Sequence, residues 1–338
     1  MKAYRLEGGE EGGRARAGAK LSLVGREVPV PQPGRGDVLV RVEAVGVCHR
    51  ELVELRGGHP APFALPLIAG HEEWWNRWAK LPTETSQCGR VVAVASEYYG
   101  TTVDGSYAPY VRAKVKSLVP LPDAVSFVEG CFLMCTAGVA LRGLRFHADL
   151  RPGERVLITG ATGGVGIHAI QLAKRVFGAH VVALTSSEAK AAVLREYGAD
   201  EVIVCSTKEQ LQQFHHSVRP PVDVALECVG TPTLNSSIRS LRPNGRLVII
   251  GNVTAGKETI NPGLLILKEL KIFGSSGASR EDLAQVLAMA AERKLKPVVH
   301  KVLPLDLAHQ AHHLLADKGV IGRVVLVPSH ARTTTAKF

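Results

Sequence analysis

The sequence lacks any long hydrophobic run, although hydrophobic residues make up 46% of it. Its apolar stretches, such as Gly245–Gly251, are far shorter than the roughly 18 residues that cross a bilayer. The first residues, Met1–Leu6, have a strand-like pattern and no apolar signal region. We therefore expect a soluble, cytoplasmic protein without a membrane partner.

A run of Lys or Arg is also missing, despite a formal net charge of +10. Nucleic-acid-binding proteins usually gather their basic residues on one face, whereas these are spread along the chain. This distribution favours a solvated surface, biased toward a phosphorylated cofactor, and no nucleic acid partner.

Cysteine is scarce, with six residues in a chain of 338. They are Cys48, Cys88, Cys131, Cys135, Cys205 and Cys228. Such scattered cysteines argue against a disulfide framework. The length predicts about two domains, each large enough for its own core, and we find no internal repeat.

Two patterns divide the chain. From Asp37 to Ala44 apolar and polar residues alternate as in a half-buried strand, so the first third is predicted to be β-rich. After Pro152-Gly153, apolar strands alternate with helical patterns, which predicts a doubly wound parallel α/β sheet. Its strands are expected at 155–159, 181–185, 201–204, 222–226, 246–250 and 270–273.

The last part of the chain is expected to return to the first domain. It has a helix-like stretch from Arg280 to Arg293, and then a strand, a helix and a strand at 299–303, 307–315 and 323–327. The tail Ser329–Phe338 is rich in Thr and small residues and is expected to fray.

A glycine-rich turn, Gly160–Gly166, lies between the strand 156–159 and a helix expected at 167–175. Glycines allow a tight turn and close backbone approach, and a helix N-terminus offers N–H groups to a pyrophosphate. This context favours dinucleotide binding over a plain structural turn. The expected contacts are Gly160, Thr162, Gly163, Gly164 and Val165, with Asn252 as a further one.

The end of the second strand indicates which dinucleotide binds. NAD sites usually carry an acidic residue there, but this chain has Thr185-Ser186-Ser187. Hydroxyls and the nearby Lys190 suit a 2′-phosphate, which predicts NADP(H). The alternative is that Lys190 only faces solvent.

Three segments, Gly46–Glu51, Gly70–Glu72 and Leu133–Cys135, precede the glycine-rich unit in that order. In this arrangement the chain resembles the zinc-type medium-chain dehydrogenase/reductase family, which includes zinc-dependent alcohol dehydrogenases, over nearly its whole length. The resemblance implies a β-rich GroES-like catalytic domain at 1–125, a Rossmann domain at 126–295, a return to the catalytic domain at 296–338, and a homodimer or homotetramer.

By this resemblance Cys48, His71 and Cys135 hold one catalytic Zn²⁺, Glu72 is an alternating fourth ligand, and Glu51 supports His71. Two thiolates and an imidazole bind zinc tightly and leave a position open, as catalytic sites do. The spacing forms no short zinc-finger motif, and a lone buried Cys or His is more often a core residue than a ligand, so the zinc assignment depends on the resemblance.

Two features depart from the family. Arg50 stands where many members have a Ser or Thr hydroxyl that relays the alcohol proton, so a water or His49 would take that role. The four closely spaced cysteines of the structural zinc lobe are missing, because Cys88 stands alone. We therefore expect at most one zinc per chain, with Cys48, His49, Arg50, His71 and Cys135 as the catalytic group.

The segment from Glu73 to about residue 89 is unusual, because it holds all three tryptophans within five positions, Trp74–Trp78. The family pattern has a Val-rich strand and a Gly-Asp-Arg-Val turn here. One hypothesis is a local frameshift in the gene or its sequencing; the other is a genuine aromatic lining of the substrate site.

The sequence therefore favours hydride transfer between NADP(H) and a small alcohol, ketone or aldehyde. The alternative is an NADPH-dependent enoyl reductase, since Gly164–Gln171 and Val229–Thr233 resemble the acryloyl-CoA reductase branch of the family. A non-catalytic cofactor-binding protein is a third possibility.

Overall fold

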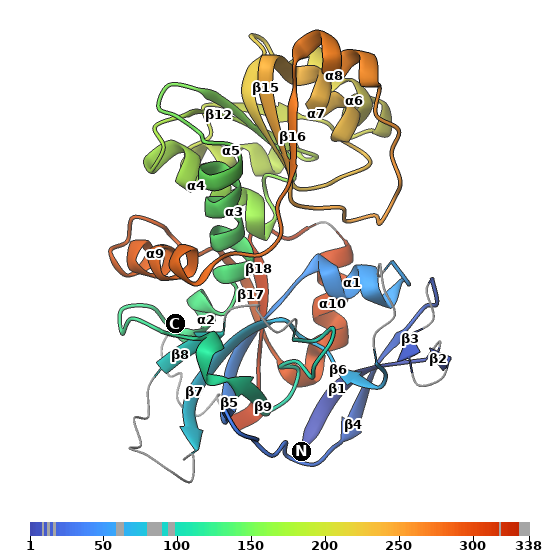
Figure 1. Ribbon diagram of the computed structural model, residues 1–338, viewed down its shortest axis with the longest axis vertical. Helices are drawn as coiled ribbons and strands as arrows, with labels where there is room; N and C mark the ends of the chain where they lie inside the picture. The colour runs from blue at the N-terminus through green and yellow to red at the C-terminus, as the bar shows by residue number, and fades with distance from the viewer. Residues whose placement is uncertain are drawn as a thin grey trace. The chain divides into compact units, whose positions relative to one another are not determined.

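The computed structural model describes residues 1–8, 10–11, 14–15, 18–58, 64–79, 90–93, 99–317 and 319–330 (Figure 1). The chain divides into two compact units, each with sheets of its own. Unit 1 comprises Met1–Met134, Leu283–Ala291 and Val299–Phe338, and unit 2 comprises Cys135–Asp282 and Glu292–Val298.

Unit 2 contains a six-stranded sheet in the order β13-β12-β11-β14-β15-β16, and all neighbouring strands in it are parallel. Its strands are β11 (Arg155–Ile158), β12 (His180–Thr185), β13 (Glu201–Val204), β14 (Val222–Glu227), β15 (Leu241–Ile249) and β16 (Lys271–Gly274). In chain order, the sheet begins at the central strand β11 and extends through β12 to β13 at one edge. The chain then returns to the other side of β11 and adds β14, β15 and β16. The predicted doubly wound parallel sheet is therefore confirmed.

The start of β15 differs from the prediction by more than one residue, because this strand begins at Leu241 rather than Arg246. Leu241 pairs with Val222, and regular pairing resumes where Arg246 lies opposite Val224. Between them Asn244 has a φ of 60°, so the chain forms an irregular bulge. The turn-forming residues of this bulge hide the first pairing from a prediction based on periodicity.

Helices cover both faces of this sheet, with α4 and α5 on one side of the strands and α6, α7 and α8 on the other (Figure 1). Their bounds are α4 (Gly164–Arg175), α5 (Glu188–Tyr197), α6 (Lys208–Gln213), α7 (Leu234–Ser240) and α8 (Pro262–Lys268). Helix α4 begins three residues before the predicted start at Ile167. Gly164 and Gly166, predicted to lie in the glycine-rich turn, are the first and third residues of the helix, although glycine disfavours helix.

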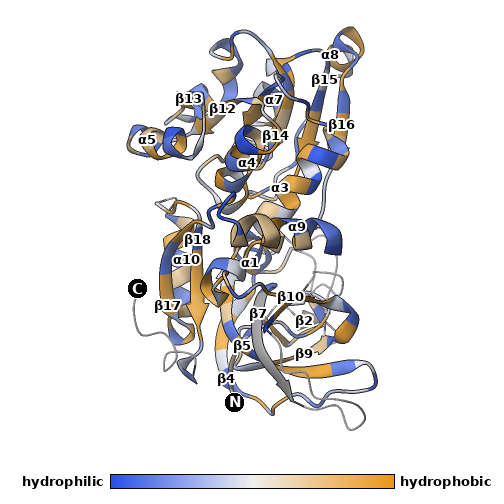
Figure 2. Cartoon of the chain, turned by 90° about the vertical axis from the view of Figure 1, so that its left-hand side faces the viewer, coloured by the Kyte–Doolittle hydropathy of each residue, from blue (hydrophilic) through white to orange (hydrophobic). Residues whose placement is uncertain are grey.

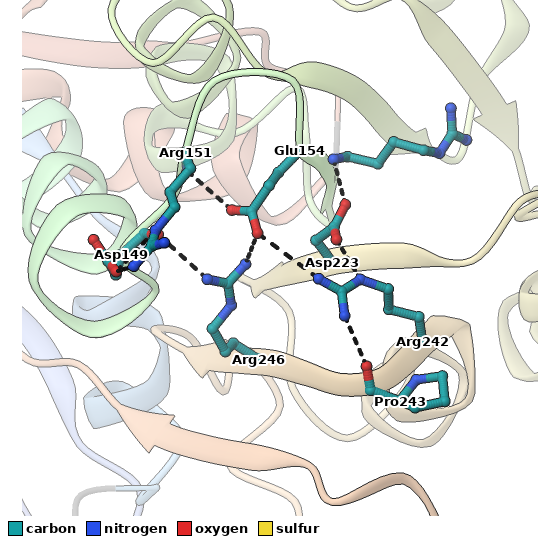
Figure 3. Close-up of polar contacts among 8 residues, drawn as sticks. Asp149, Arg151, Glu154, Asp223, Arg242, Pro243 and Arg246 are labelled. Atoms are coloured by element: carbon teal, nitrogen blue, oxygen red, sulfur yellow. Dashed lines mark hydrogen bonds and ion pairs between the residues drawn. The ribbon is translucent and has the colours of Figure 1, made fainter.

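The amino ends of β11, β14 and β15 are tied by acidic and basic side chains (Figure 3). Oε1 of Glu154 lies 2.5 Å from Nη2 of Arg246, and Arg242 pairs with Asp223. Asp223 also accepts the backbone N–H of Arg155 at 2.7 Å. This network ties together the amino ends of the three strands, whereas the Gly160 turn lies at the carboxyl end of β11.

Unit 1 is rich in β-strands, as predicted. One sheet has the order β4-β1-β6, a second has the order β10-β8-β7-β5-β18-β17 with β9 also paired to β5, and β2 pairs with β3. The strands are β1 (Lys2–Glu7), β2 (Glu10–Glu11), β3 (Arg14–Ala15), β4 (Ser22–Glu27), β5 (Asp37–Val47), β6 (Leu67–Ile68), β7 (Glu72–Ala79), β8 (Arg90–Ala93), β9 (Tyr110–Lys114), β10 (Leu118–Pro120), β17 (Val299–Pro304) and β18 (Arg323–Val327).

Strand β5 is more deeply buried than its alternating pattern predicted. Every residue from Val42 to Val47 is buried, on both faces of the strand. The reason is its central position, since it pairs with β7 along one edge and with β9 and β18 along the other. The hydrophobic residues of β5, β17 and β18 are visible as orange segments in Figure 2.

The C-terminal elements join unit 1. Strands β17 and β18 pair in parallel, and β18 continues the sheet beside β5. The helices of this unit are α1 (His49–Leu55), α2 (Phe127–Gly130), α10 (Ala308–Ala316) and most of α9 (Arg280–Ala291). Of the tail expected to fray, residues 331–338 lie outside the described residues, whereas Nε2 of His330 lies 2.9 Å from the carbonyl oxygen of Val42.

A helical stretch from Phe127 to His147 is apolar and long enough to cross a membrane, and 78% of its most apolar window is buried within the protein. This burial is typical of a core helix. The stretch includes α2, α3 (Val139–Arg142) and two π-helical segments, η3 (Met134–Gly138) and η4 (Gly143–His147).

Candidate active site

Four side chains that can bind a metal ion lie together. Their donor atoms are all within 4.8 Å of one another, and in the described part of the chain this is the only such group: Cys48, His71, Glu72 and Cys135. Cys48 caps α1, and Glu72 is the first residue of β7. Cys135 lies in η3, directly after Met134 of unit 1, and π-helical turns often occur at functional sites.

The turn before His71 requires glycine. Gly70 has a φ of +96°, and a Cβ there would lie 2.5 Å from Cδ1 of Tyr107. The backbone of Tyr107 is fixed beside this turn, because its N–H donates to the carbonyl of Ala69 at 2.8 Å. The close packing holds the chain in the path that places His71 beside Cys48.

Glu51 contacts two of the four residues. Its Oε1 lies 2.7 Å from Nδ1 of His71, and its Oε2 accepts the backbone N–H of Cys48 at 2.9 Å. Burial opposes ionisation of both Glu51 and His71, but their mutual attraction lowers the pKa of Glu51 and raises that of His71. Glu51 therefore orients His71 through one oxygen and the start of α1 through the other.

Glu72 is held by a residue that the sequence analysis missed. Arg323, at the start of β18, donates from Nε to Oε2 of Glu72 at 3.0 Å, and a second contact joins Nη2 to Oε1. Nη2 of Arg323 also lies 3.4 Å from Sγ of Cys48. Burial raises the pKa of Glu72 to about 7, although the charge of Arg323 opposes this. The signal that could have identified Arg323 is a cationic residue at the start of a strand that is otherwise apolar and is fully buried.

The donor set fits zinc. Ligands at 2.0 to 2.3 Å in a tetrahedron stand roughly 3.3 to 3.8 Å apart, which agrees with a group gathered within 4.8 Å. Two thiols, one imidazole and one carboxylate are zinc's usual donors, and three of them with an open fourth position form a catalytic site. The partner of His71, Glu51, is of the kind that supports such ligands.

The predicted dinucleotide site lies in unit 2, between β11 and α4. Gly160 has a φ of +56°, and a Cβ at Gly166 would lie 2.4 Å from the carbonyl oxygen of Gly160. The predicted residues Gly160, Thr162, Gly163, Gly164 and Val165 all lie in this turn or the first turn of α4. The first turn of this twelve-residue helix therefore offers its free N–H groups beside a glycine-rich turn that a dinucleotide can approach closely.

Comparison with known proteins gives three kinds of match. A family model described as "Zinc-binding dehydrogenase" matches residues 164–292. Acryloyl-coenzyme A reductase of Sulfurisphaera tokodaii is 35% identical over 92% of this chain and 98% of its own length. Alcohol dehydrogenase of Geobacillus stearothermophilus is 31% identical over 91% and 96%. The crystal structure of AibC has a TM-score of 0.79 and 34% identity, covering 96% of each chain.

The chain belongs to the zinc-type medium-chain dehydrogenase/reductase family. Solved alcohol dehydrogenases share its architecture, so the fold is a Rossmann sheet in unit 2 combined with a GroES-like β-rich domain in unit 1. Membership of this family makes the protein an oxidoreductase that uses zinc and a nicotinamide cofactor.

For a member of this family, Arg50 has unusual surroundings. Its Nε donates to Oε1 of the buried Glu54 at 2.9 Å, and Nη2 contacts Thr101. His49 is half-buried, and burial lowers its pKa. In place of a relay hydroxyl, Cys48 is thus followed by a histidine whose pKa is lowered by burial and by an Arg that is ion-paired with Glu54.

The residues expected to select the cofactor lie at the carboxyl end of β12. Thr185 is buried, and its Oγ1 accepts the backbone N–H of Ser187 at 3.4 Å, whereas Ser186 is exposed. Lys190 is half-buried, and burial lowers its pKa. Asn252 is exposed and donates from Nδ2 to the carbonyl of Gly256 at 2.9 Å.

The unusual segment falls partly outside the described residues. Glu72–Ala79 form β7, which pairs with β5 and β8, so the backbone is a strand where the family pattern also has one. Residues 80–89, including Cys88, lie outside the described residues.

Proposed function

We propose that this enzyme transfers hydride between NADP(H) and a small alcohol, ketone or aldehyde, with Cys48, His71 and Cys135 as zinc ligands. The observation that carries the proposal is the donor group within 4.8 Å, with Glu51 oriented toward His71. In the reductive direction, a ketone, NADPH and one proton give an alcohol and NADP⁺. Zinc, when bound, polarises the carbonyl oxygen and stabilises the negative charge that develops on it.

The chain's own residues keep this group organised. Glu51 contacts Nδ1 of His71, which leaves Nε2 as the nitrogen for the metal. Arg323 engages Glu72 and thereby holds its carboxylate beside the two thiols. Glu72 would serve as the alternating fourth ligand, and Arg323 would hold its carboxylate when it is not bound to the metal.

We propose NADP(H) rather than NAD(H), since β12 ends at Thr185 and is directly followed by Ser186 and Ser187 instead of an acidic residue. Exposed Ser186 and half-buried Lys190 offer a hydroxyl and a cation to a 2′-phosphate. Proton exchange with solvent is assigned to His49 or a water, because Arg50 is engaged by Glu54. We place the enzyme in the cytoplasm, as a homodimer or homotetramer that acts on small molecules.

A second candidate is reduction of the carbon–carbon double bond of an enoyl thioester. Two observations favour it: Arg50 replaces the relay hydroxyl, and acryloyl-coenzyme A reductases of two archaea, S. tokodaii and Metallosphaera sedula, are each 35% identical to this chain. Hydrogen-bond donors can stabilise an enolate, so this reaction does not require the zinc ligands.

Zinc content measured together with NADPH oxidation distinguishes the two candidates. We expect Cys48→Ser and His71→Ala to lose zinc and ketone or aldehyde reduction while keeping cofactor affinity. Cys205→Ala, a buried cysteine of unit 2, is the matched control and should behave as wild type. If zinc-free protein reduces an enoyl-CoA as fast as the intact protein, and neither reduces carbonyls, the second candidate replaces the first.

A further inference from the structure

A buried carboxylate lies at the carboxyl edge of the unit 2 sheet. Glu227, the last residue of β14, has no solvent exposure. Five groups donate hydrogen bonds to its carboxylate. Oε1 accepts from the hydroxyls of Thr159 and Thr233, both at 2.7 Å, and from the backbone N–H groups of Val229 at 2.9 Å and Gly230 at 3.0 Å. Oε2 accepts from the hydroxyl of Ser237 at 2.5 Å.

These five donors are neutral hydroxyls and amides. Burying an ionised carboxylate is costly, and neutral donors compensate for it only if several converge on it. Hydrogen bonds to an ionised acceptor are about twice as strong as neutral ones. An ionised Glu227 therefore holds the segments that donate to it more firmly in place than a neutral side chain of the same shape would.

The donors come from the segments around the dinucleotide turn. Thr159 directly precedes Gly160, and its hydroxyl also accepts the backbone N–H of Cys228 at 2.9 Å. A Cβ on Gly160 would lie 3.1 Å from Cγ2 of Val229, so the loop that follows Glu227 packs directly on the turn. Glu227 thus connects the ends of the adjacent strands β11 and β14 at the point where the cofactor phosphates are expected.

The same loop also supports Asn252. The N–H of Val253 donates to the carbonyl of Val229 at 3.0 Å, and a Cβ at Gly230 would lie 2.8 Å from Cα of Asn252. Because Gly230 itself donates to Glu227, any displacement of the carboxylate is transmitted to Asn252 through two direct contacts.

We propose that Glu227 is a positioning residue for the dinucleotide: its charge, acting through Thr159 and the 228–233 loop, holds the Gly160 turn and Asn252 in the arrangement that binds the cofactor. This inference rests on the proposed nicotinamide site.

Two substitutions separate the charge from the local bonding. Glu227→Gln keeps the shape and an acceptor oxygen but removes the charge. Thr159→Val keeps the volume and removes only the hydroxyl that joins β11 to Glu227. Ser240→Ala is the control, because its buried hydroxyl bonds to the carbonyl of Ser236 in its own helix and not to Glu227.

The measurements are the Kd of NADPH, and of NADH, by fluorescence titration, KM and kcat, zinc content and thermal unfolding. We expect Glu227→Gln and Thr159→Val each to raise the Kd and KM of the cofactor by about tenfold, the loss that corresponds to roughly one net hydrogen bond. The kcat at saturating cofactor and the zinc content should stay near wild type, as should every value for Ser240→Ala.

A merely structural role would lower the unfolding temperature and leave the Kd of the folded protein unchanged. Kd values within twofold of wild type in Thr159→Val, and in Glu227→Gln where it folds, overturn the inference. If Glu227→Gln does not fold, Thr159→Val alone decides. If wild-type protein binds neither dinucleotide, the proposed function fails instead, so the two failures are distinguishable.

Discussion

Arg323 and Glu72 form a buried ion pair between β18 and β7, with side chains that are 4% and 0% exposed. The pair lies beside the candidate zinc ligands, because Nη2 of Arg323 also approaches Sγ of Cys48. Removing one partner of a buried pair leaves an uncompensated charge, whereas removing both does not.

We therefore expect Arg323→Met to lower the free energy of unfolding by about 3–5 kcal/mol. The double variant Arg323→Met with Glu72→Gln should recover much of this loss, because the stranded carboxylate is gone. Urea unfolding of the two variants and of Glu72→Gln gives the coupling energy. A double variant as unstable as Arg323→Met would show that the loss comes from packing rather than charge.

A second prediction concerns Glu51, which contacts both Cys48 and His71. Glu51→Gln removes the charge beside Nδ1 of His71 and should weaken zinc binding by about 10- to 100-fold. Competition with a chromogenic chelator measures this affinity directly. Glu54→Gln is the matched control on the same helix, since Glu54 contacts Arg50 instead. Equal affinities in both variants and wild type would remove Glu51 from the zinc site.

A third prediction concerns His312, whose Nε2 lies 3.1 Å from the hydroxyl of the buried Tyr107. Burial lowers the pKa of His312 below its ordinary value of about 6.5. The unfolded chain therefore binds this proton more readily than the folded one. The contribution of His312 to the free energy of unfolding is therefore fully present above about pH 6.5, and it is lost as the pH falls toward the pKa of His312 in the folded protein.

His312→Gln should consequently lose less stability than wild type between pH 8 and pH 5, by at most about 1.4 kcal/mol per pH unit. Urea unfolding across this range provides the comparison. His216→Asn, which replaces an exposed histidine of unit 2, serves as the control and should follow the wild-type pH dependence. If His312→Gln has the wild-type slope, His312 is not responsible for the acid sensitivity.

The unit 2 sheet could be predicted because each strand is a short apolar run between turn residues, and local pattern carries that information. The bulge at Asn244 and the start of α4 could not, since both depend on packing rather than periodicity. The partner of Glu72 is Arg323, 251 residues away, and Thr159 reaches Glu227 across 68 residues. Such pairs are set by the topology, so a single sequence gives the ligand types and the turn but not the residues that support them.

The last prediction concerns cofactor choice and follows from the exposure of the residues after β12. Thr185 is buried, so an acidic residue that is to face a ribose belongs at the exposed Ser186. Ser186→Asp should repel a 2′-phosphate and accept hydrogen bonds from a 2′-hydroxyl, which shifts the ratio of kcat/KM for NADPH and NADH toward NADH.

Lys190→Ala tests the cation of the same site. It should raise the KM of NADPH by about tenfold and leave the KM of NADH nearly unchanged, because one charge-assisted hydrogen bond contributes about 1.5–3 kcal/mol. Lys174→Ala, a cation on α4 that pairs with Asp200, is the control and should alter neither KM. Wild-type protein that prefers NADH, or Lys190→Ala that affects both cofactors equally, would contradict the assignment of NADP(H).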